Sequence, residues 1–195
     1  GFWDSAYTPF SFFKGGQVVS SVCLYLLDAL VHGEQAKLVQ ISGVGTHRDF
    51  RNRGLNRELT LRGLEWAKGS YSGLFLFADE DAIPYYEHCG FSPVTEYLHE
   101  ISVEPRSPQF GSIPLDPINK EDLKKIYSYA RTRETISNHF SVIAPKLLMF
   151  HALYTMRNNM VAVPDLDCVV FMNHYDDCLS IYDIINQGRH LFSLF

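Results

Sequence analysis

At 195 residues, with 46% hydrophobic and 20% charged residues, the chain can form one or two modest globular domains with a real core. The net charge of -5 argues against a general nucleic-acid binder, and no apolar run approaches the ~20 residues that span a bilayer. The four cysteines lack C-x-x-C spacing, which favours reduced thiols in a cytoplasmic protein. The eight histidines are scattered, so we expect no metal site.

The N-terminal part of the chain reads as β-structure. We interpret Gly1–Pro9 as a segment packed over a hydrophobic edge, although its aromatic residues would also suit an acceptor pocket. Phe10–Leu27 has the pattern of a hairpin with its turn at Gly15-Gly16, and Leu38–Thr46 should pair with it. The glycines at positions 43 and 45 predict a bulge in that third strand.

The stretch after this strand has the pattern strand, basic glycine loop, helix. A polar turn at His47–Phe50 precedes the loop, and a helical pattern begins at Leu55. The apolar face of this helix should contain Leu55, Leu59, Gly63, Trp66 and Ala67. The unpaired N–H groups of a helix start favour an anion, and nearby arginines add positive charge, so the pattern predicts a phosphate site. The alternative is an ordinary tight turn with solvated arginines.

The next elements are shorter. Leu74–Ala78 has the composition of a buried strand. The carboxylates at positions 79–81 precede a helix over Ala82–His88, where they could cap its N-terminus. Pro84 suits the first turn of that helix and Gly90 its C-cap, and Val94–Val103 reads as a closing strand pair.

A proline-rich stretch separates this part from a second one. We therefore divide the chain into a domain at 1–104, a linker at 105–117 and a unit at 118–195. In the last unit Asn119 should cap an amphipathic helix, whose buried face would be Leu123, Ile126, Tyr127 and Ala130. A second helix should start at Pro145 and bury Leu147, Phe150, His151 and Tyr154, with His151 as a core histidine. A hairpin follows, with strands at Asp167–Asn173 and Cys178–Ile185 and a turn at 175–177.

Two motifs in this order resemble those of the GNAT acetyltransferase superfamily. The run RNRGLN at 51–56 resembles the pyrophosphate-binding signature of that family, and AIPYYEHCGF at 82–91 resembles its downstream helix block. Neither GxxxxGK[ST] nor GxGxxG occurs in the loop. The resemblance covers about Phe10–Val103 and implies an α+β (mixed α/β) fold, a mostly antiparallel sheet flanked by helices, with the family's front helices absent from this chain.

The resemblance also implies acetyl-CoA as the acyl-donor cosubstrate and assigns roles to residues. Tyr86 would protonate the departing thiolate. Apart from the resemblance, the carboxylate cluster at 79–81 suggests that one of its members, with Asp79 and Glu80 as candidates, takes a proton from the attacking amine. The cosubstrate would be held by Val44, Thr46, Arg51, Asn52, Arg53, Gly54, Asn56, Arg57 and Tyr85. Three positions depart from the family pattern: Asn52 and Asn56 replace smaller residues, and Asp79 replaces an asparagine.

These features favour an N-acetyltransferase in which a small-molecule or peptide amine attacks acetyl-CoA directly. A non-catalytic acyl-CoA-binding regulatory module and a structural protein-interaction domain are the alternatives, and a homodimer is possible. The helix, helix, hairpin order of the C-terminal part resembles a degenerate second GNAT-like unit. Alternatively, that part completes the first unit.

Overall fold

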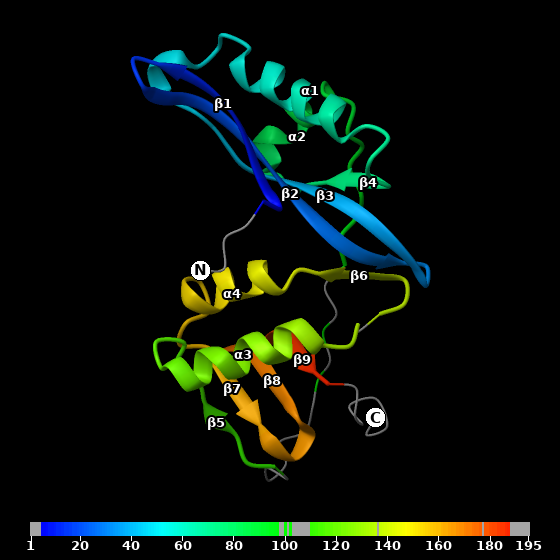
Figure 1. The fold of residues 1–195 in the computed structure, drawn as a ribbon, viewed down its shortest axis with the longest axis vertical. Helices are drawn as coiled ribbons and strands as arrows, with labels where there is room; N and C mark the ends of the chain where they lie inside the picture. Colours follow the sequence, from blue (N-terminus) through cyan, green and yellow to red (C-terminus); the bar gives the residue numbers. More distant parts are fainter. Residues whose placement is uncertain are drawn as a thin grey trace. The chain divides into compact units, whose positions relative to one another are not determined.

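The computed structural model describes residues 5–97, 100, 102, 110–135, 137–176 and 178–187. The chain divides into two compact units, one at Trp3–Ser102 and a second that includes Val103–Phe195 (Figure 1). The start of the expected packing segment, Gly1–Asp4, lies outside the described residues. Among the residues described, no helix is long and apolar enough to cross a membrane.

The N-terminal unit is built on a sheet whose strands follow the order β1-β2-β3-β4 (Figure 1). These strands are β1 (Tyr7–Lys14), β2 (Gln17–Val31), β3 (Glu34–Thr46) and β4 (Gly73–Phe75). The hairpin is confirmed, although both of its strands extend beyond Phe10–Leu27. Its turn at Gly15-Gly16 has φ values of 57° and 79°, which glycine adopts without strain. The third strand pairs antiparallel with β2, as predicted.

A bulge interrupts β3 where the glycines predicted it. Ser21 pairs with Gly45 and Cys23 with Ser42, so Val22 alone faces two residues of β3. Gly43 has a φ of 55°, and a Cβ there would lie 2.8 Å from the hydroxyl oxygen of Tyr7. Both the backbone conformation and the available space therefore require glycine at this position.

The helix α1 (Leu55–Ala67) begins at the predicted residue and packs on one face of the sheet (Figure 1). Close packing depends on Gly63, where a Cβ would lie 2.9 Å from a methyl carbon of Leu24. The expected burial of Trp66 is wrong, because 41% of this side chain is exposed and its ring lies against Phe10 and Tyr71. The inward position is taken instead by Thr60, which is fully buried.

Two predicted strands are shorter or missing. The strand expected at Leu74–Ala78 ends at Phe75, because β4 pairs in parallel with β3 only opposite Leu38–Gln40. The closing strand pair expected at Val94–Val103 is wrong over 94–97, where no strand forms. Val94 is 90% exposed, so the apolar positions of this segment do not form a buried face. Part of the remaining prediction lies outside the described residues.

The short helix α2 (Ile83–Glu87) follows the 3-10 turn η2 (Glu80–Ala82). Pro84 lies in its first turn, as predicted. The amide of Gly90 donates to the Glu87 carbonyl and that of Phe91 to the Tyr86 carbonyl, and Gly90 has a φ of 95°. This is a Schellman ending with glycine as its left-handed residue, which confirms the expected cap. The expected N-capping is wrong, because the Asp79 side chain makes no capping hydrogen bond.

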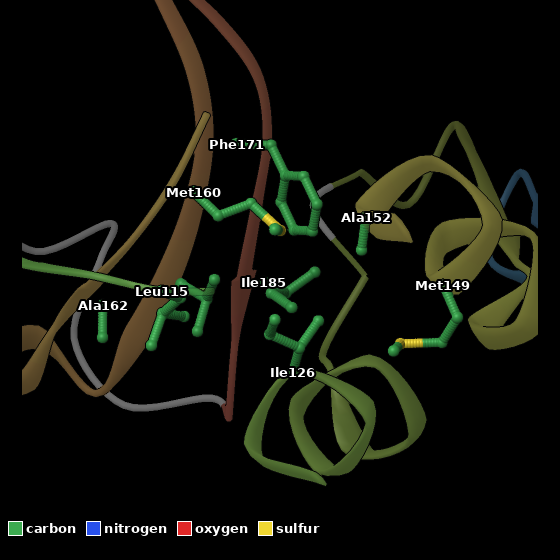
Figure 2. Packing of buried hydrophobic residues seen from close by; sticks show 9 residues of the cluster. Leu115, Ile126, Met149, Ala152, Met160, Ala162, Phe171 and Ile185 are labelled. Carbon is green, nitrogen blue, oxygen red and sulfur yellow. The ribbon is translucent and has the colours of Figure 1, made fainter. Parts of the chain in front are cut away.

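The second unit has its own antiparallel sheet in the order β5-β7-β8-β9. Its elements are β5 (Ile113–Pro114), α3 (Lys120–Thr132), β6 (Phe140–Ile143), α4 (Pro145–Leu153), β7 (Met160–Val163), η3 (Pro164–Leu166), β8 (Cys168–Tyr175) and β9 (Cys178–Asn186). The predicted hairpin is confirmed as β8 and β9. Side chains from both helices and from the sheet form one core between them (Figure 2).

The two helices of this unit differ in how well their sequences predict them. The Asn119 side chain accepts hydrogen bonds from two amides of α3, which confirms the cap, and Ile126 and Ala130 are buried. The helix α4 starts at Pro145 as predicted, but it buries Met149 and Ala152 instead of the expected face. Phe150, His151 and Tyr154 are exposed, so the prediction of a core histidine is wrong. The helix is apolar nearly all round, and periodicity cannot select a face in such a sequence.

The stretch interpreted as a linker contributes to this core. Ile113 and Pro114 pair with β7, and the Leu115 side chain is buried in the same cluster as Ile126. Proline in an edge strand loses no ladder hydrogen bond, which explains how a proline-rich segment joins the sheet.

Candidate functional site

A groove of about 760 Å³ opens in the N-terminal unit where β3 and the chain after β4 separate. All six residues of Ile41–Thr46 line one wall, and Phe77, Ala78 and Asp79 line the other. The loop Phe50–Arg57 lies at one end, and Ala82, Tyr85 and Tyr86 of the α2 region also line the groove. Because β4 stops pairing after Phe75, the outer edge of β3 is free to face a ligand along this wall.

The loop at one end of the groove presents backbone amides. Asn52 has a φ of 59° and Gly54 a φ of 73°, both in the left-handed region that asparagine and glycine tolerate. Gly54 is the N-cap of α1 and provides no side chain to cap it. The first N–H groups of this 13-residue helix therefore remain available to an anion, which the helix dipole also favours. A Cβ at position 54 would meet nothing within 4 Å, so the space beside these amides is open.

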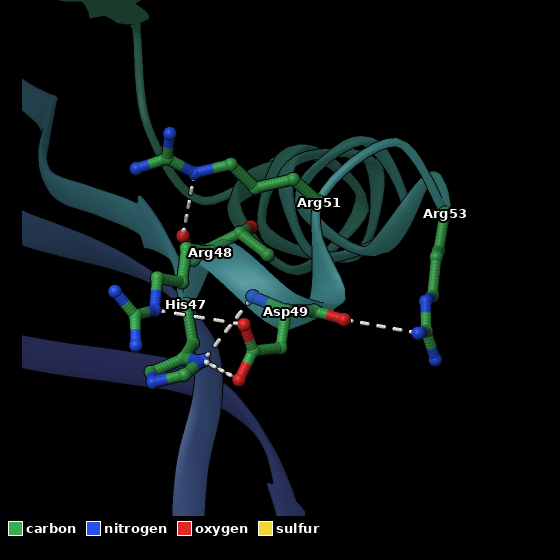
Figure 3. A network of polar contacts seen from close by, with 6 residues as sticks. His47, Arg48, Asp49, Arg51 and Arg53 are labelled. Atoms are coloured by element: carbon green, nitrogen blue, oxygen red, sulfur yellow. Dashed lines mark hydrogen bonds and ion pairs between the residues drawn. The ribbon is translucent and has the colours of Figure 1, made fainter.

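Two arginines are held beside this helix start by backbone carbonyls (Figure 3). The Arg51 Nε donates to the Thr46 carbonyl at 3.3 Å, and the Arg53 guanidinium donates to the Asp49 carbonyl at 2.9 Å. A carbonyl orients a guanidinium without neutralising it, so both charges still act on an anion. The Asp49 carboxylate instead faces Arg48 at 3.6 Å and His47 at 3.8 Å.

An aromatic ring steadies the cationic loop. The Phe50 ring has Lys14 at 5.2 Å and Arg53 at 5.1 Å from its centroid. Contacts of this kind contribute about 0.5–1 kcal/mol each at exposed sites. They hold two cations close to the groove without a carboxylate.

A buried serine connects the groove to the interior of the sheet. Ser20, only 1% exposed, lies 2.9 Å from the Thr46 hydroxyl and donates to the Asn56 side-chain oxygen at 2.8 Å. Asn56 is one of the two loop residues that depart from the family pattern. Its side-chain oxygen is tied back to β2, and this contact fixes the first turn of α1 against the end of β3.

Two tyrosines of α2 lie on the same groove. The Tyr85 hydroxyl lies 2.8 Å from Thr60, and burial raises the pKa of Tyr85 to about 12. Burial also raises the pKa of Tyr86, with smaller contributions from Cys89 and Asp79. The centroids of the two rings are 4.9 Å apart. Both hydroxyls therefore remain protonated at neutral pH and can donate a proton or a hydrogen bond.

The structure gathers most of the residues that the sequence singled out. Every predicted cosubstrate-binding residue lines the groove, namely Val44, Thr46, Arg51, Asn52, Arg53, Gly54, Asn56, Arg57 and Tyr85. Of the three predicted catalytic residues, Tyr86 and Asp79 also line it. Glu80 is exposed in η2 and is not among the lining residues. Its carboxylate is therefore not brought to the groove.

Sequence reasoning missed Ser20 and Thr60. Each is a polar residue at an inward position of an otherwise apolar pattern, in β2 and α1 respectively. A buried hydroxyl needs a hydrogen-bond partner, so these positions indicate contacts that the apolar pattern alone does not explain. The partners, Asn56 and Tyr85, both line the groove.

Comparisons with known proteins agree with this geometry. Residues 2–91 match the model of the acetyltransferase (GNAT) family. No curated protein matches the chain. Solved structures similar to it include an acetyltransferase from Trypanosoma brucei, with 20% identity over 51% of this chain and 70% of that one, at a TM-score of 0.43.

Two further structures are similar over about half of the chain. Glucosamine-6-phosphate N-acetyltransferase from Arabidopsis thaliana has 14% identity over 49% of this chain and 67% of that one, at a TM-score of 0.43. A predicted acetyltransferase from Clostridium acetobutylicum, solved with acetyl-CoA, has 17% identity over 49% of this chain and 64% of that one, at a TM-score of 0.44. These TM-scores are below 0.5, and the assignment rests on the family match. The N-terminal unit, over residues 2–91, belongs to the GNAT acetyltransferase family.

Proposed function

We propose that this protein is an acetyl-CoA-dependent N-acetyltransferase that acts on a small-molecule or peptide amine. The observation that carries the proposal is a single groove with an anion-binding loop at one end and two protonated tyrosines also on its lining. Family membership supports acetyl transfer in general. The amine acceptor and the direct attack are the parts of the proposal that need experiments.

The residues present fit acetyl-CoA. The open space at Gly54, the uncapped start of α1 and the carbonyl-held arginines suit its pyrophosphate. The free edge of β3 around Val44 suits the pantetheine arm, because its amides and carbonyls have no β4 partner there. Tyr85 would pack against the same ligand with its hydroxyl turned to Thr60. The bound cosubstrate supplies an activated acetyl group.

In the proposed reaction the amine nitrogen bonds to the acetyl carbonyl carbon and the carbon–sulfur bond breaks, without a covalent enzyme intermediate. The Val44 amide, at the bulge, would stabilise negative charge on the carbonyl oxygen. Tyr86 would give its proton to the departing sulfur, and the Asp79 carboxylate would accept the proton lost by the amine. Most of the acceleration would come from positioning.

The first test is an isothermal titration of the whole chain with acetyl-CoA. Micromolar binding that is lost in an Arg51→Ala/Arg53→Ala variant would support the phosphate loop. Arg62→Ala is the control, because Arg62 pairs with Glu58 on α1 and does not line the groove. Absence of binding by the unmodified chain would contradict the proposal, and self-association or capture of a protein partner would then favour the structural alternative.

The second test separates an enzyme from a regulatory acyl-CoA-binding module. Tyr86→Phe should lower turnover by about 10²–10⁴-fold with a panel of amines and leave acetyl-CoA affinity unchanged. Tyr71→Phe, a tyrosine of the same unit outside the groove lining, should have no effect. If the unmodified chain binds acetyl-CoA but acetylates no amine, the regulatory function replaces the proposed one.

A further inference from the structure

The C-terminal unit contains a cavity of its own, of about 350 Å³. Its apolar lining comes from α3, α4, the turn after α4 and β8, through Ala130, Leu148, Met156 and Phe171. The polar lining includes Arg133, Asp183, His151 and Thr155. Volumes of a few hundred Å³ with a mostly apolar wall and a few placed polar groups are typical of small-molecule sites. No function discussed above uses this cavity.

One wall of the cavity is a nearly buried ion pair. The Arg133 guanidinium donates to both carboxylate oxygens of Asp183, at 2.6 and 2.8 Å, and also to the Ile184 carbonyl at 3.4 Å. The two side chains are 14% and 27% exposed. Such a pair stabilises a fold little compared with apolar residues of the same volume. The pair is electrically neutral and held in one geometry by its hydrogen bonds. The Asp183 carboxylate still has lone pairs that can accept a hydrogen bond.

The second polar group is a neutral histidine. The Thr155 hydroxyl donates to the His151 carbonyl at 3.3 Å and lies 3.0 Å from His151 Nδ1. In the tautomer in which both contacts are hydrogen bonds, Nδ1 carries the ring hydrogen, because the hydroxyl has only one proton to donate. In that tautomer His151 Nε2 is the acceptor of the ring. Surrounding protein also lowers the pKa of His151, which keeps the imidazole neutral at pH 7.

These groups select the charge of an occupant. Arg133 and Asp183 neutralise each other, so the wall does not favour a charged occupant of either sign. The Arg133 nitrogens Nη1 and Nη2 both donate to Asp183, and the Asp183 carboxylate keeps unused lone pairs, so the ion pair can accept a further hydrogen bond. With the acceptor nitrogen of His151, the wall favours a hydrogen-bond donor without charge. The rest of the lining favours an apolar body.

We propose that this cavity binds a neutral, mostly apolar small molecule that carries a hydroxyl donor. The hydroxyl hydrogen-bonds to His151 Nε2 or to Asp183, and the apolar body lies against Phe171, Leu148 and Met156. The site belongs to the C-terminal unit alone and is distinct from the acetyl-CoA groove, so it stands whether or not the protein is an acetyltransferase.

The test compares two probes on the whole chain, 1-naphthol and 1-methoxynaphthalene, which differ in the hydroxyl proton. Binding is followed by isothermal titration and by methyl NMR of Leu148 and Met156. We expect 1-naphthol to shift these methyl signals with a dissociation constant below ~1 mM, and 1-methoxynaphthalene to bind about tenfold more weakly. Equal affinities, or no shift of the cavity methyl groups, would overturn the proposal.

A matched pair of variants tests the donor contact. His151→Phe keeps a ring of similar size but removes the acceptor, so it should abolish the preference for 1-naphthol. His174→Phe, at an exposed residue of β8 outside the cavity lining, should preserve it. Chemical shifts of Ile126 and Ile185 report whether each variant retains the core. If 1-naphthol shifts only groove residues such as Val44 and Leu55, the proposed site is wrong.

Discussion

The helices α1 and α3 each have 13 residues, and they begin in opposite ways. The helix α3 starts at Asn119, whose side chain accepts from two amides, and its first turn contains Glu121 and Asp122. The helix α1 starts at Gly54 with no side-chain cap, and the one acidic residue of its first turn, Glu58, pairs with Arg62. The first backbone N–H groups of α3 therefore have a side-chain acceptor, whereas those of α1 have none.

The arginines beside the two helices show the same contrast. Arg133, the C-cap of α3, is neutralised by the Asp183 carboxylate. Arg51 and Arg53 are oriented by uncharged carbonyls. In α3 the groups that could attract an anion are used for stability, whereas in α1 they remain for a ligand. The difference supports the hypothesis that the C-terminal unit lacks a phosphate loop, whatever its relation to the first unit.

The largest expected effect is the loss of stability when the carboxylate that pairs with Arg133 is removed. Asp183→Asn should destabilise the C-terminal unit by about 3 kcal/mol, because it leaves the guanidinium of Arg133 largely buried without its carboxylate. Hydrogen exchange of the amides of α3 and β9 in the whole chain measures the loss. Unchanged protection of those amides would show that the pair is not needed for stability and would weaken the contrast.

The next largest effect concerns the uncapped start of α1 and the affinity for acetyl-CoA. Gly54→Asp should lower acetyl-CoA affinity about tenfold, since a carboxylate would occupy the amides and repel the phosphates (about 1.4 kcal/mol). The matched control is Gly69→Asp, a glycine with a φ of 75° and equally open space just after α1. Equal losses in both variants would mean that backbone strain, and not the anion site, causes the effect.

A change at the capped start of α3 should alter the stability of the C-terminal unit. Asn119→Ala should cost about 1 kcal/mol, because two amides of α3 lose their acceptor. Urea unfolding followed on signals of the C-terminal unit measures the change. Asn158→Ala, exposed in the turn after α4, is the control and should shift the midpoint much less. No difference between the variants would show that water replaces the cap fully.

The smallest effect concerns a surface pair on α1. Glu58 and Arg62 lie one turn apart with side chains 51% and 60% exposed. Glu58→Gln should therefore change the free energy of unfolding by only about 0.3–0.5 kcal/mol, and the change should shrink at high salt. Thermal unfolding at two salt concentrations tests this. A loss approaching that of Asp183→Asn would contradict the distinction between exposed and buried pairs.

Local signals predicted the elements that depend on short-range chemistry. Residue spacing located the starts of α1, α3 and α4, the Gly15-Gly16 turn and the bulge at Gly43, because caps, prolines and glycines act within a few residues. The loop residues Arg51–Arg57 and two tyrosines of α2, Tyr85 and Tyr86, line one groove. Burial was predicted poorly where a helix is apolar on every side, as the wrong face of α4 shows.

The sequence by itself determined the order of strand, loop and helix over residues 38–67 and the loop residues that line the groove, because these follow from backbone preferences and motif spacing. Only the tertiary structure decided that β4 stops at Phe75, that Ser20 holds Asn56, and that His151 faces a cavity instead of a core. Each of these depends on contacts between residues distant in the chain. No local pattern encodes which partner a strand edge, a buried hydroxyl or an imidazole will meet.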